Sequence, residues 1–440
     1  MSDQPFGFGL PSDDPDEPGD GGPGGANPFA AFGFGPGDLN AANLSPANLG
    51  AMLEQVGRML QSGGEGPVNW QLAHDTARQA VAARGDASVL RTEREAVDEA
   101  VRLAEVWLDP VTALPAGTST AVAWSRAEWV EGTLPVWKGL IEPLAARMAE
   151  ASTSALPAEA QAMAGPMLGM FQQLGGAMVG AQAGQALGQL AGEVVGSTDI
   201  GLPLGPEGKA ILVPVNIRSY AEGLGVPEDE VRLHLALREC AHQRLFAHVP
   251  WLRGALLDAV GAYAAGITFD ADTLRERMGS IDPNDPASIQ GALESGLFEP
   301  ADTPAQSAAL ERLETLLALV EGWVDLVVEA AATPTLPHAV ALAETARRRR
   351  AAGGPAEATF AALVGLQLRP RRMREAADLW RQLTEALGSD GRDAVWENPL
   401  GLPGPADLAE PAAYIARRAS VDDEVAGLEI PDDLSGLDDL

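Results

Sequence analysis

The chain has 440 residues, a formal net charge of −32 and an isoelectric point near 4.4. Such an acidic chain repels phosphate backbones and anionic lipid headgroups, so we expect neither nucleic acid nor a membrane as a partner. Its single cysteine, Cys240, excludes an intramolecular disulfide, and the first residues lack a basic segment followed by an apolar run, so the sequence predicts a cytoplasmic protein.

Both ends of the chain are predicted to be disordered. Residues 1–66 form an arm rich in Gly, Pro and Asp with repeated Phe-Gly pairs, and this arm buries too little apolar surface to offset the entropy of ordering it. Residues 419–440 form an acidic tail, since the last twenty residues contain eight acids and no base. We therefore expect one folded domain over residues 67–418.

The domain is predicted to be mainly α with a small β element, an α+β fold. Its apolar residues recur mostly at helical spacing, with one helix over residues 70–83, capped by Asn69, and another over residues 92–108. Strands are predicted over residues 119–124 and 210–216, and Pro214 marks the second one as an edge strand.

A glycine-rich apolar stretch covers residues 163–196. Several glutamines lie within it, so a soluble helix is favoured over a membrane span. Its glycines recur at every fourth position, 176, 180, 184, 188 and 192, which places them on one face of a helix. The pattern predicts that another helix packs closely against this face.

The histidines gather in one predicted helix. Acidic residues 228–230 follow Pro227, which is typical of a helix start, and the helix should end before Pro250. Three of the five histidines of the chain, His234, His242 and His248, lie within or just after this helix.

The segment Leu237-Arg238-Glu239-Cys240-Ala241-His242, followed by Val249-Pro250-Trp251-Leu252, resembles an actinobacterial family of hydrolases described as zinc-dependent, zincin-like metallopeptidases. That family is related to a set associated with coenzyme F420 biosynthesis. Shorter segments agree with it at residues 68–70, 126–129, 212–217, 319–323 and 395–399. The resemblance covers roughly residues 67–418 and implies a zincin-like metallopeptidase domain that acts on a peptide or protein substrate.

The His-Glu-x-x-His motif of zincins works because residues four apart share one helix face. Two imidazoles then bind one zinc ion while the glutamate activates a bound water. The resemblance implies that Glu239 is the catalytic base and His242 a metal ligand. Arg238 stands at the first ligand position, and a guanidinium has no lone pair to donate and repels a cation. The motif is therefore degenerate, and we expect Arg238 to hold Glu239 and Glu321 instead of a metal.

Further ligands are less clearly marked. The resemblance at residues 319–323 makes Glu321 the candidate for a ligand from a second helix. The alternative assigns it to the polar stripe of an amphipathic helix, with Glu314, Asp325 and Glu329. His248 has metzincin spacing from His242, although leucine replaces the glycine of that motif. His234 lies about 12 Å along the helix axis from His242, too far for both to bind one ion. His248 and His234 stay as candidate metal or pocket residues.

Arg347–Arg350 is a densely basic stretch close to the break Gly353-Gly354-Pro355. We interpret it as the solvated end of a helix rather than an anion-binding patch.

Two functions follow from these motifs. The first is a zinc-dependent hydrolase with a degenerate Arg-Glu-x-x-His motif. The alternative is a metal-free pseudoenzyme in which Arg238 takes the place of the cation and the cleft binds a peptide or protein without cutting it. A third and weaker hypothesis is an interaction protein that works through its Phe-Gly arm.

Overall fold

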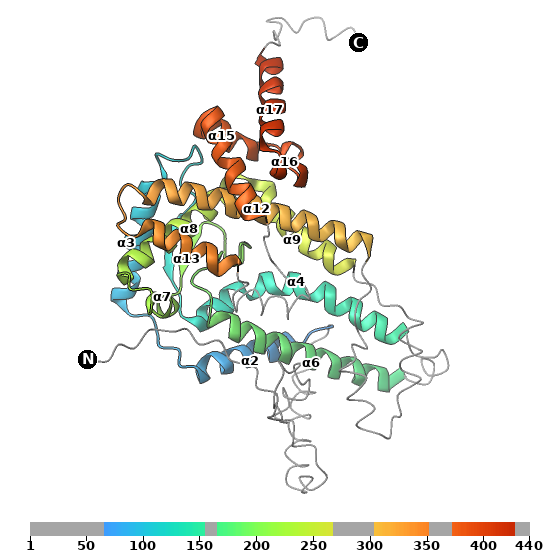
Figure 1. Cartoon of the computed structure of the whole chain (residues 1–440). Helices are drawn as coiled ribbons and strands as arrows, with labels where there is room; N and C mark the ends of the chain where they lie inside the picture. Colours follow the sequence, from blue (N-terminus) through green and yellow to red (C-terminus); the bar gives the residue numbers. More distant parts are fainter. Residues whose placement is uncertain (1–65, 155–164, 267–302, 352–371, 427–440) are drawn as a thin grey trace, which may run out of the picture. The chain divides into compact units, whose positions relative to one another are not determined.

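The computed structural model describes residues 66–154, 165–266, 303–351 and 372–426 (Figure 1). This part of the chain is mostly helical with a two-stranded sheet, which confirms the predicted fold class. The predicted arm lies almost entirely outside the described residues, as does most of the predicted tail. Helix α17 (Pro411–Ala426) runs past the boundary predicted at residue 418.

The remaining elements follow in chain order. They are α2 (Trp70–Ala83), α3 (Arg91–Leu108), β1 (Thr120–Ala123), α4 (Arg126–Ser154), α6 (Gly165–Ala191), β2 (Lys209–Leu212), α7 (Pro214–Ala221), α8 (Glu228–His248), α9 (Pro250–Ala265), α12 (Pro304–Ala332), α13 (Ala339–Ala351), α15 (Met373–Asp393), the 3-10 helices η3 (Ala394–Glu397) and η4 (Pro399–Gly401), and α16 (Pro405–Ala409). Among the residues described, no helix combines the length and apolar character needed to cross a membrane.

Helices α2 and α6 lie side by side (Figure 1), and glycines of the predicted stripe face α2. A Cβ atom added at Gly184 would lie 2.3 Å from the carbonyl oxygen of Ala73, and one added at Gly180 would lie 2.4 Å from that of Asn69. Asn69 also caps α2, accepting a hydrogen bond from the amide of Leu72 at 3.0 Å. The predicted close packing along the glycine stripe is confirmed.

Strands β1 and β2 pair in parallel, with register Thr120↔Lys209 through Ala123↔Leu212. The prediction of a strand through residue 216 was wrong at its end, because β2 stops at Leu212 and Pro214 begins α7. Proline lacks a backbone N–H and has a fixed φ, so it fits the first turn of a helix, where that N–H has no intrahelical partner.

Helix α8 carries the motif residues Arg238, Glu239 and His242. It runs from Glu228 to His248, just before Pro250, and packs against α3, α7, α9, α12, α13 and β2. Neighbours on several sides bury Glu239 and His242, to 3% and 1% exposure, along with the apolar residues. Buried polar groups must find partners within the protein, so the packing of α8 decides the chemistry of its motif.

The carboxylate of Asp393, at the end of α15, joins distant parts of the chain. It accepts hydrogen bonds from Thr112 Oγ1 at 2.6 Å and from Trp323 Nε1 at 2.7 Å. Arg392 neutralises it at 2.6 Å. Trp323 is fully buried, and its neighbourhood forms part of the main apolar core.

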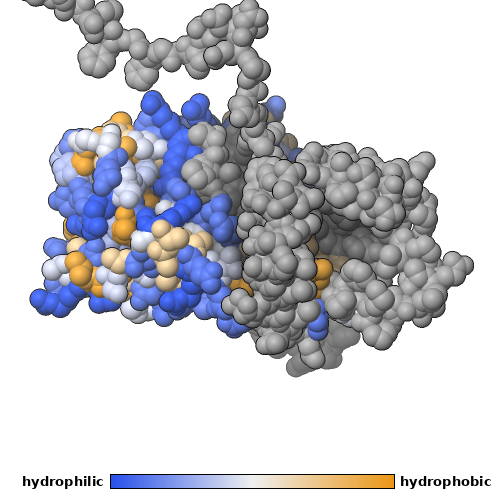
Figure 2. All heavy atoms as spheres, turned by 90° about the horizontal axis from the view of Figure 1, so that it is seen from below, coloured by the Kyte–Doolittle hydropathy of each residue, from blue (hydrophilic) through white to orange (hydrophobic). Residues whose placement is uncertain are grey.

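Figure 2 shows one face of the molecule. Where the described residues are drawn, hydrophilic residues predominate and hydrophobic ones occur in small groups. The exposed large hydrophobic residues of this part of the chain are Leu90, Leu103, Val106, Val340 and Leu400. Only Leu103 and Val106 among them share a helix, so they do not form one continuous apolar surface.

Candidate functional site

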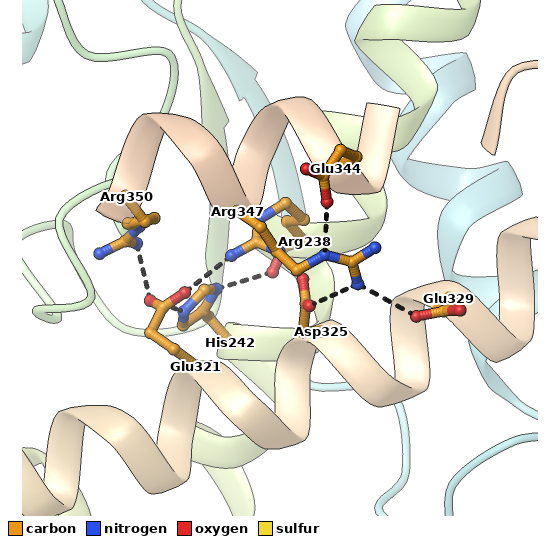
Figure 3. Close-up of polar contacts among 8 residues, drawn as sticks. All are labelled: Arg238, His242, Glu321, Asp325, Glu329, Glu344, Arg347 and Arg350. Carbon is orange, nitrogen blue, oxygen red and sulfur yellow. Dashed lines mark hydrogen bonds and ion pairs between the residues drawn. The ribbon is translucent and has the colours of Figure 1, made fainter. Parts of the chain in front are cut away.

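Two pairs of polar residues face each other where α8 packs against α12. Arg238 and His242 are one turn apart on α8, and Glu321 and Asp325 are one turn apart on α12 (Figure 3). Arg238 Nη2 lies 2.7 Å from Glu321 Oε2, and Arg238 Nη1 lies 3.0 Å from Asp325 Oδ1. One guanidinium therefore bridges two carboxylates on the neighbouring helix.

Glu321 lies at the centre of this cluster, and its side chain has no solvent exposure. Its Oε1 atom accepts a hydrogen bond from Arg350 Nη2 at 2.7 Å and faces His242 Nε2 at 3.0 Å. Burial alone would raise the pKa of this carboxyl, but the positive charges of Arg350, His242 and Arg238 outweigh burial and hold it below its ordinary value. Glu321 is thus an ionised carboxylate with both oxygens engaged.

The ring of His242 has an acceptor at each nitrogen. Nδ1 lies 2.8 Å from the carbonyl oxygen of Arg238, and Nε2 faces the Glu321 carboxylate. A backbone carbonyl and an ionised carboxylate can only accept, so both ring nitrogens of His242 lie within hydrogen-bond distance of acceptors. Neither nitrogen faces an open position for a metal ion in this arrangement.

Helix α13 supplies the remaining cations (Figure 3). Arg347 Nη1 pairs with Asp325 at 3.1 Å and with Glu329 at 3.2 Å, and Arg350 pairs with Glu321. The interpretation of Arg347–Arg350 as a solvated helix end was wrong for most of the stretch. Arg348 is 78% exposed, but Arg350 is buried because it neutralises a carboxylate inside the fold.

Glu239, the residue matching the catalytic base, has a different environment. Its two oxygens accept hydrogen bonds from the hydroxyls of Ser197 at 2.5 Å and Thr198 at 2.6 Å, with weaker contacts from the amide groups of Thr198, Ile211 and Gln243. The expectation that Arg238 would hold both glutamates was correct for Glu321 and wrong for Glu239. Residues 238 and 239 point about 100° apart around a helix, so only one of them shares the face that meets α12.

The sequence profile of the zincin-like metallopeptidase family matches residues 68–415 of the chain. The chain belongs to this family.

A solved structure supports the fold assignment. The crystal structure of "a putative hydrolase with a novel fold" from Chloroflexus aurantiacus superposes with a TM-score of 0.57 at 22% sequence identity, covering 80% of this chain and 98% of that one. At this identity the similarity is evidence for the fold alone. A search of curated proteins found no match.

The side chains of this zincin-like site do not fit a zinc ion in the arrangement described. The first ligand position holds a guanidinium, and both oxygens of Glu321 and both ring nitrogens of His242 are already engaged. Within the described ranges, no group of three or more His, Cys, Asp or Glu side chains is arranged to hold a metal ion. The site is an ion-pair network built on the framework of a zincin motif.

The two other candidate histidines stand apart from this network. His234 is 2% exposed, and neither ring nitrogen has a hydrogen-bond partner among the residues that the structure describes. Burial lowers its pKa to about 3, with a further contribution from the charges of Arg238 and Arg347. His248 is exposed at the end of α8, where Nε2 faces the carbonyl oxygen of Ala116 at 3.4 Å.

Sequence reasoning placed Arg238, His242 and Glu321 near one another but missed most of their partners. Asp325 was considered only as part of the polar stripe given as the alternative for Glu321, but it is 8% exposed. Arg350 was assigned to a solvated helix end, but it is buried. One signal was available, since Glu321 and Asp325 repeat the four-residue spacing of Arg238 and His242 and so can meet them across two packed helices. Ser197 and Thr198 carried no comparable signal, because they lie outside any regular element.

Proposed function

We propose that this chain is a zinc-independent member of the zincin-like metallopeptidase family, a pseudoenzyme that binds a peptide or protein without zinc-dependent hydrolysis. The observation that carries the proposal is the contact of Arg238 with Glu321, at 2.7 Å in a buried setting. In this proposal the positive charge of Arg238 takes the place of the charge of a zinc ion. The motif helix then serves as a framework that joins α8, α12 and α13.

Electrostatics supports this assignment. Two unit charges of the same sign about 4 Å apart repel by about 4 kcal/mol at an effective dielectric of about 20. A zinc ion beside Glu321 would meet two guanidiniums, those of Arg238 and Arg350. Zinc would therefore have to displace two fixed cations from one carboxylate before it could bind.

The environment of Glu239 supports the same conclusion. A general base in a zincin must be free to take a proton from a metal-bound water. Glu239 instead accepts hydrogen bonds from Ser197 and Thr198, which themselves are 0% and 2% exposed. A Cβ atom added at Gly196 would lie 2.7 Å from Glu239 Oε2, so the chain packs directly on this carboxylate. We assign Glu239 a structural role, in which it ties α8 to the segment that precedes β2.

A second candidate function is the zinc-dependent hydrolase predicted from the motif, with Glu239, His242 and Glu321 at its centre. One observation favours it. His242 Nε2 and Glu321 Oε1 lie 3.0 Å apart, a separation that two ligands of one ion can adopt when each is about 2 Å from it. This alternative requires Arg238 and Arg350 to release Glu321.

Zinc binding separates the two functions. Elemental analysis and calorimetric zinc titration would be made on the natural chain, on Arg238→His and on the control Arg232→His, which adds a histidine to the same helix outside the cluster. We expect weak or no zinc binding by the natural chain and by the control. Arg238→His should gain affinity, and combining it with Arg350→Gln should increase the gain because Glu321 is then released from both guanidiniums.

The opposite result is equally definite. Stoichiometric, tight zinc in the natural chain that is lost in His242→Ala would overturn the pseudoenzyme proposal in favour of the hydrolase.

Some predictions rest on the sequence alone. They are the kinship with proteins associated with coenzyme F420 biosynthesis, the actinobacterial origin, the cytoplasmic location and the exclusion of nucleic acid. The Phe-Gly arm lies outside the described residues, and its deletion tests the third hypothesis.

A further inference from the structure

Two arginines of α13 meet two acids of α12 (Figure 3). Arg350 Nη2 lies 2.7 Å from Glu321 Oε1, and Arg347 Nη1 lies 3.1 Å from Asp325 Oδ2. The later arginine meets the earlier acid, so the two helices run in opposite directions at this contact. Residues three or four apart share a helix face. A pair of arginines three positions apart therefore fits a pair of acids four positions apart on the neighbouring helix.

The other two arginines of the run have different surroundings. Arg349 Nη2 lies 3.2 Å from Asp199 Oδ2 and donates a hydrogen bond to the carbonyl oxygen of Glu193 at 2.7 Å. Arg348 is 78% exposed and pairs with Glu344 of its own helix. Three of the four arginines thus bind acids outside α13, and Arg348 provides an internal comparison.

Apolar burial contributes little to the attachment of α13. As far as its side chains are described, its buried apolar residues are Leu342 and three alanines, Ala339, Ala343 and Ala346. By contrast, α12 buries leucines, valines and a tryptophan along most of its length. The hydrophobic contribution scales with the apolar area that is buried, so ion pairs hold α13 to a greater extent than they hold α12. Elements with few buried apolar contacts open at a lower free energy than the core.

Movement of α13 away from the network would uncover acidic side chains. Glu321, Asp325 and Asp199 are 0%, 10% and 17% exposed with α13 in place, and they would lose three guanidiniums. In the described part of the chain, the side chains left in contact with them are Arg238 and His242. A surface with three carboxylates and one guanidinium attracts a cationic segment. The chain already supplies one such segment, which is α13 itself.

We propose that α13 is an internal ligand of the motif region, and that the surface beneath it binds an arginine-rich helical segment of a protein partner. The partner replaces α13, and two of its arginines, three positions apart, pair with Asp325 and Glu321. An internal occupant lowers the apparent affinity for a partner by the fraction of molecules in which the surface is open. Helix α13 therefore regulates binding. This inference rests on the proposed function, because it names the class of partner that is bound at the motif region.

Peptide titration of the full chain tests the proposal. The probe is the acetylated and amidated peptide of residues 339–351, which carries the arginines at the required spacing, and its binding is followed by fluorescence anisotropy in the presence of EDTA. We expect weak binding by the natural chain and about tenfold tighter binding by Arg347→Gln/Arg350→Gln, because its own α13 competes less well. Adding Asp325→Asn to this variant should remove the gain. The matched control Arg348→Gln removes an exposed arginine that pairs within α13, and it should bind as the natural chain does.

Two further measurements address charge and folding. The chain is strongly acidic, so a second probe has the same composition but no two arginines three or four positions apart, and it should bind about tenfold more weakly. Amide hydrogen exchange of the natural chain requires no substitution. The amides of α13 should exchange faster than those of α12, because α13 opens without global unfolding. Arg347→Gln alone, at a side chain that is 29% exposed, replaces the double variant if that variant does not fold.

Three outcomes would overturn the inference. They are equal peptide affinity of the natural chain and the arginine variant, equal affinity for the rearranged peptide, and exchange of the α13 amides as slow as that of α12. Zinc titration of the natural chain without EDTA keeps the two questions apart. Tight zinc with the expected peptide binding would contradict the pseudoenzyme alone. Zinc-free protein whose arginine variant gains no peptide affinity would contradict the role of α13 alone.

Discussion

Arg238 and Glu321 meet across the interface of α8 and α12 with Nη2 and Oε2 2.7 Å apart, and the carboxylate has no exposure to solvent. Removing one partner of a buried ion pair leaves an uncompensated charge, which commonly costs about 3–5 kcal/mol. The two partners here are unequal, because Glu321 also neutralises Arg350.

This inequality gives the first prediction. Glu321→Gln should lower the free energy of unfolding by about 3–5 kcal/mol, since it leaves two buried guanidiniums without their shared carboxylate. Arg238→Met should cost less, because Arg350 and His242 still hold Glu321. Urea denaturation measures both changes. The exposed pair Arg102–Asp98 is the control, and Asp98→Asn should change stability by less than about 1 kcal/mol. A larger loss for Arg238→Met than for Glu321→Gln would contradict the assignment of Glu321 as the centre.

The second prediction concerns acid. The pKa of Glu321 is lowered in the folded state from its ordinary value of 4.5. Its contribution to stability is therefore complete above about pH 4.5 and is lost as the pH falls through the lower, folded pKa. The difference in unfolding free energy between the natural chain and Glu321→Gln should be constant near neutral pH and should shrink below about pH 4.5. Denaturation curves across this range test it, and a difference that grows in acid would refute it.

The third prediction concerns His234, whose pKa is lowered from 6.5 to about 3 by burial and by the charges of Arg238 and Arg347. The unfolded chain takes up a proton below about pH 6.5 that the folded chain refuses, so stability should fall by up to about 1.4 kcal/mol per pH unit between these values. His234→Leu should remove that slope. It should also preserve or increase stability at neutral pH, because both ring nitrogens lack partners in the described part of the chain. His248→Gln, at an exposed position, should keep the slope. A slope unchanged in His234→Leu would assign the titration to another group.

The fourth prediction compares two glycines of α6. Gly184→Ala should destabilise the fold by about 1–3 kcal/mol, because the new Cβ would lie 2.3 Å from the carbonyl oxygen of Ala73. Gly175→Ala meets nothing within 4 Å and should stabilise the helix by up to about 1 kcal/mol. Opposite signs in thermal denaturation would confirm that α2 packs on the glycine stripe. Equal effects would mean that the two helices are not in backbone contact in solution.

Much of the fold could be predicted from local patterns. The four-residue recurrence of glycine predicted that another helix packs closely on α6, because a helix face without side chains allows close backbone approach. The identity of that helix, α2, came from the structure. The strand predicted through Pro214 was wrong because the apolar residues around Pro214 are typical of a strand. The missing N–H of proline is compatible both with an edge strand and with the first turn of a helix. Only the pairing of β2 with β1 settles which of the two applies.

Within the candidate site, the pairing of Arg238 with Glu321 could be predicted from the sequence, but the contacts made by the arginines of α13 could not. The family resemblance made Glu321 the candidate from a second helix. Because a guanidinium cannot bind zinc, Arg238 could then be paired with this acid. The arginines of α13 could not be placed in the same way. A basic run at a helix end looks the same whether it faces water or a buried carboxylate, and the choice depends on how α13 packs, which no spacing in the sequence encodes.

The hydrogen bonds to Asp393 have a consequence for the order in which the chain folds. Thr112 and Asp393 are 281 positions apart, and chains are synthesised and begin to fold from the N-terminus. The donors Thr112 and Trp323 must therefore wait without their buried acceptor until nearly the whole domain has left the ribosome. Contacts of such separation slow folding, and a chain cut short before α15 ends keeps two core donors without an acceptor. The core is therefore complete only once α15, which ends at Asp393, has packed against the helices that precede it in the chain.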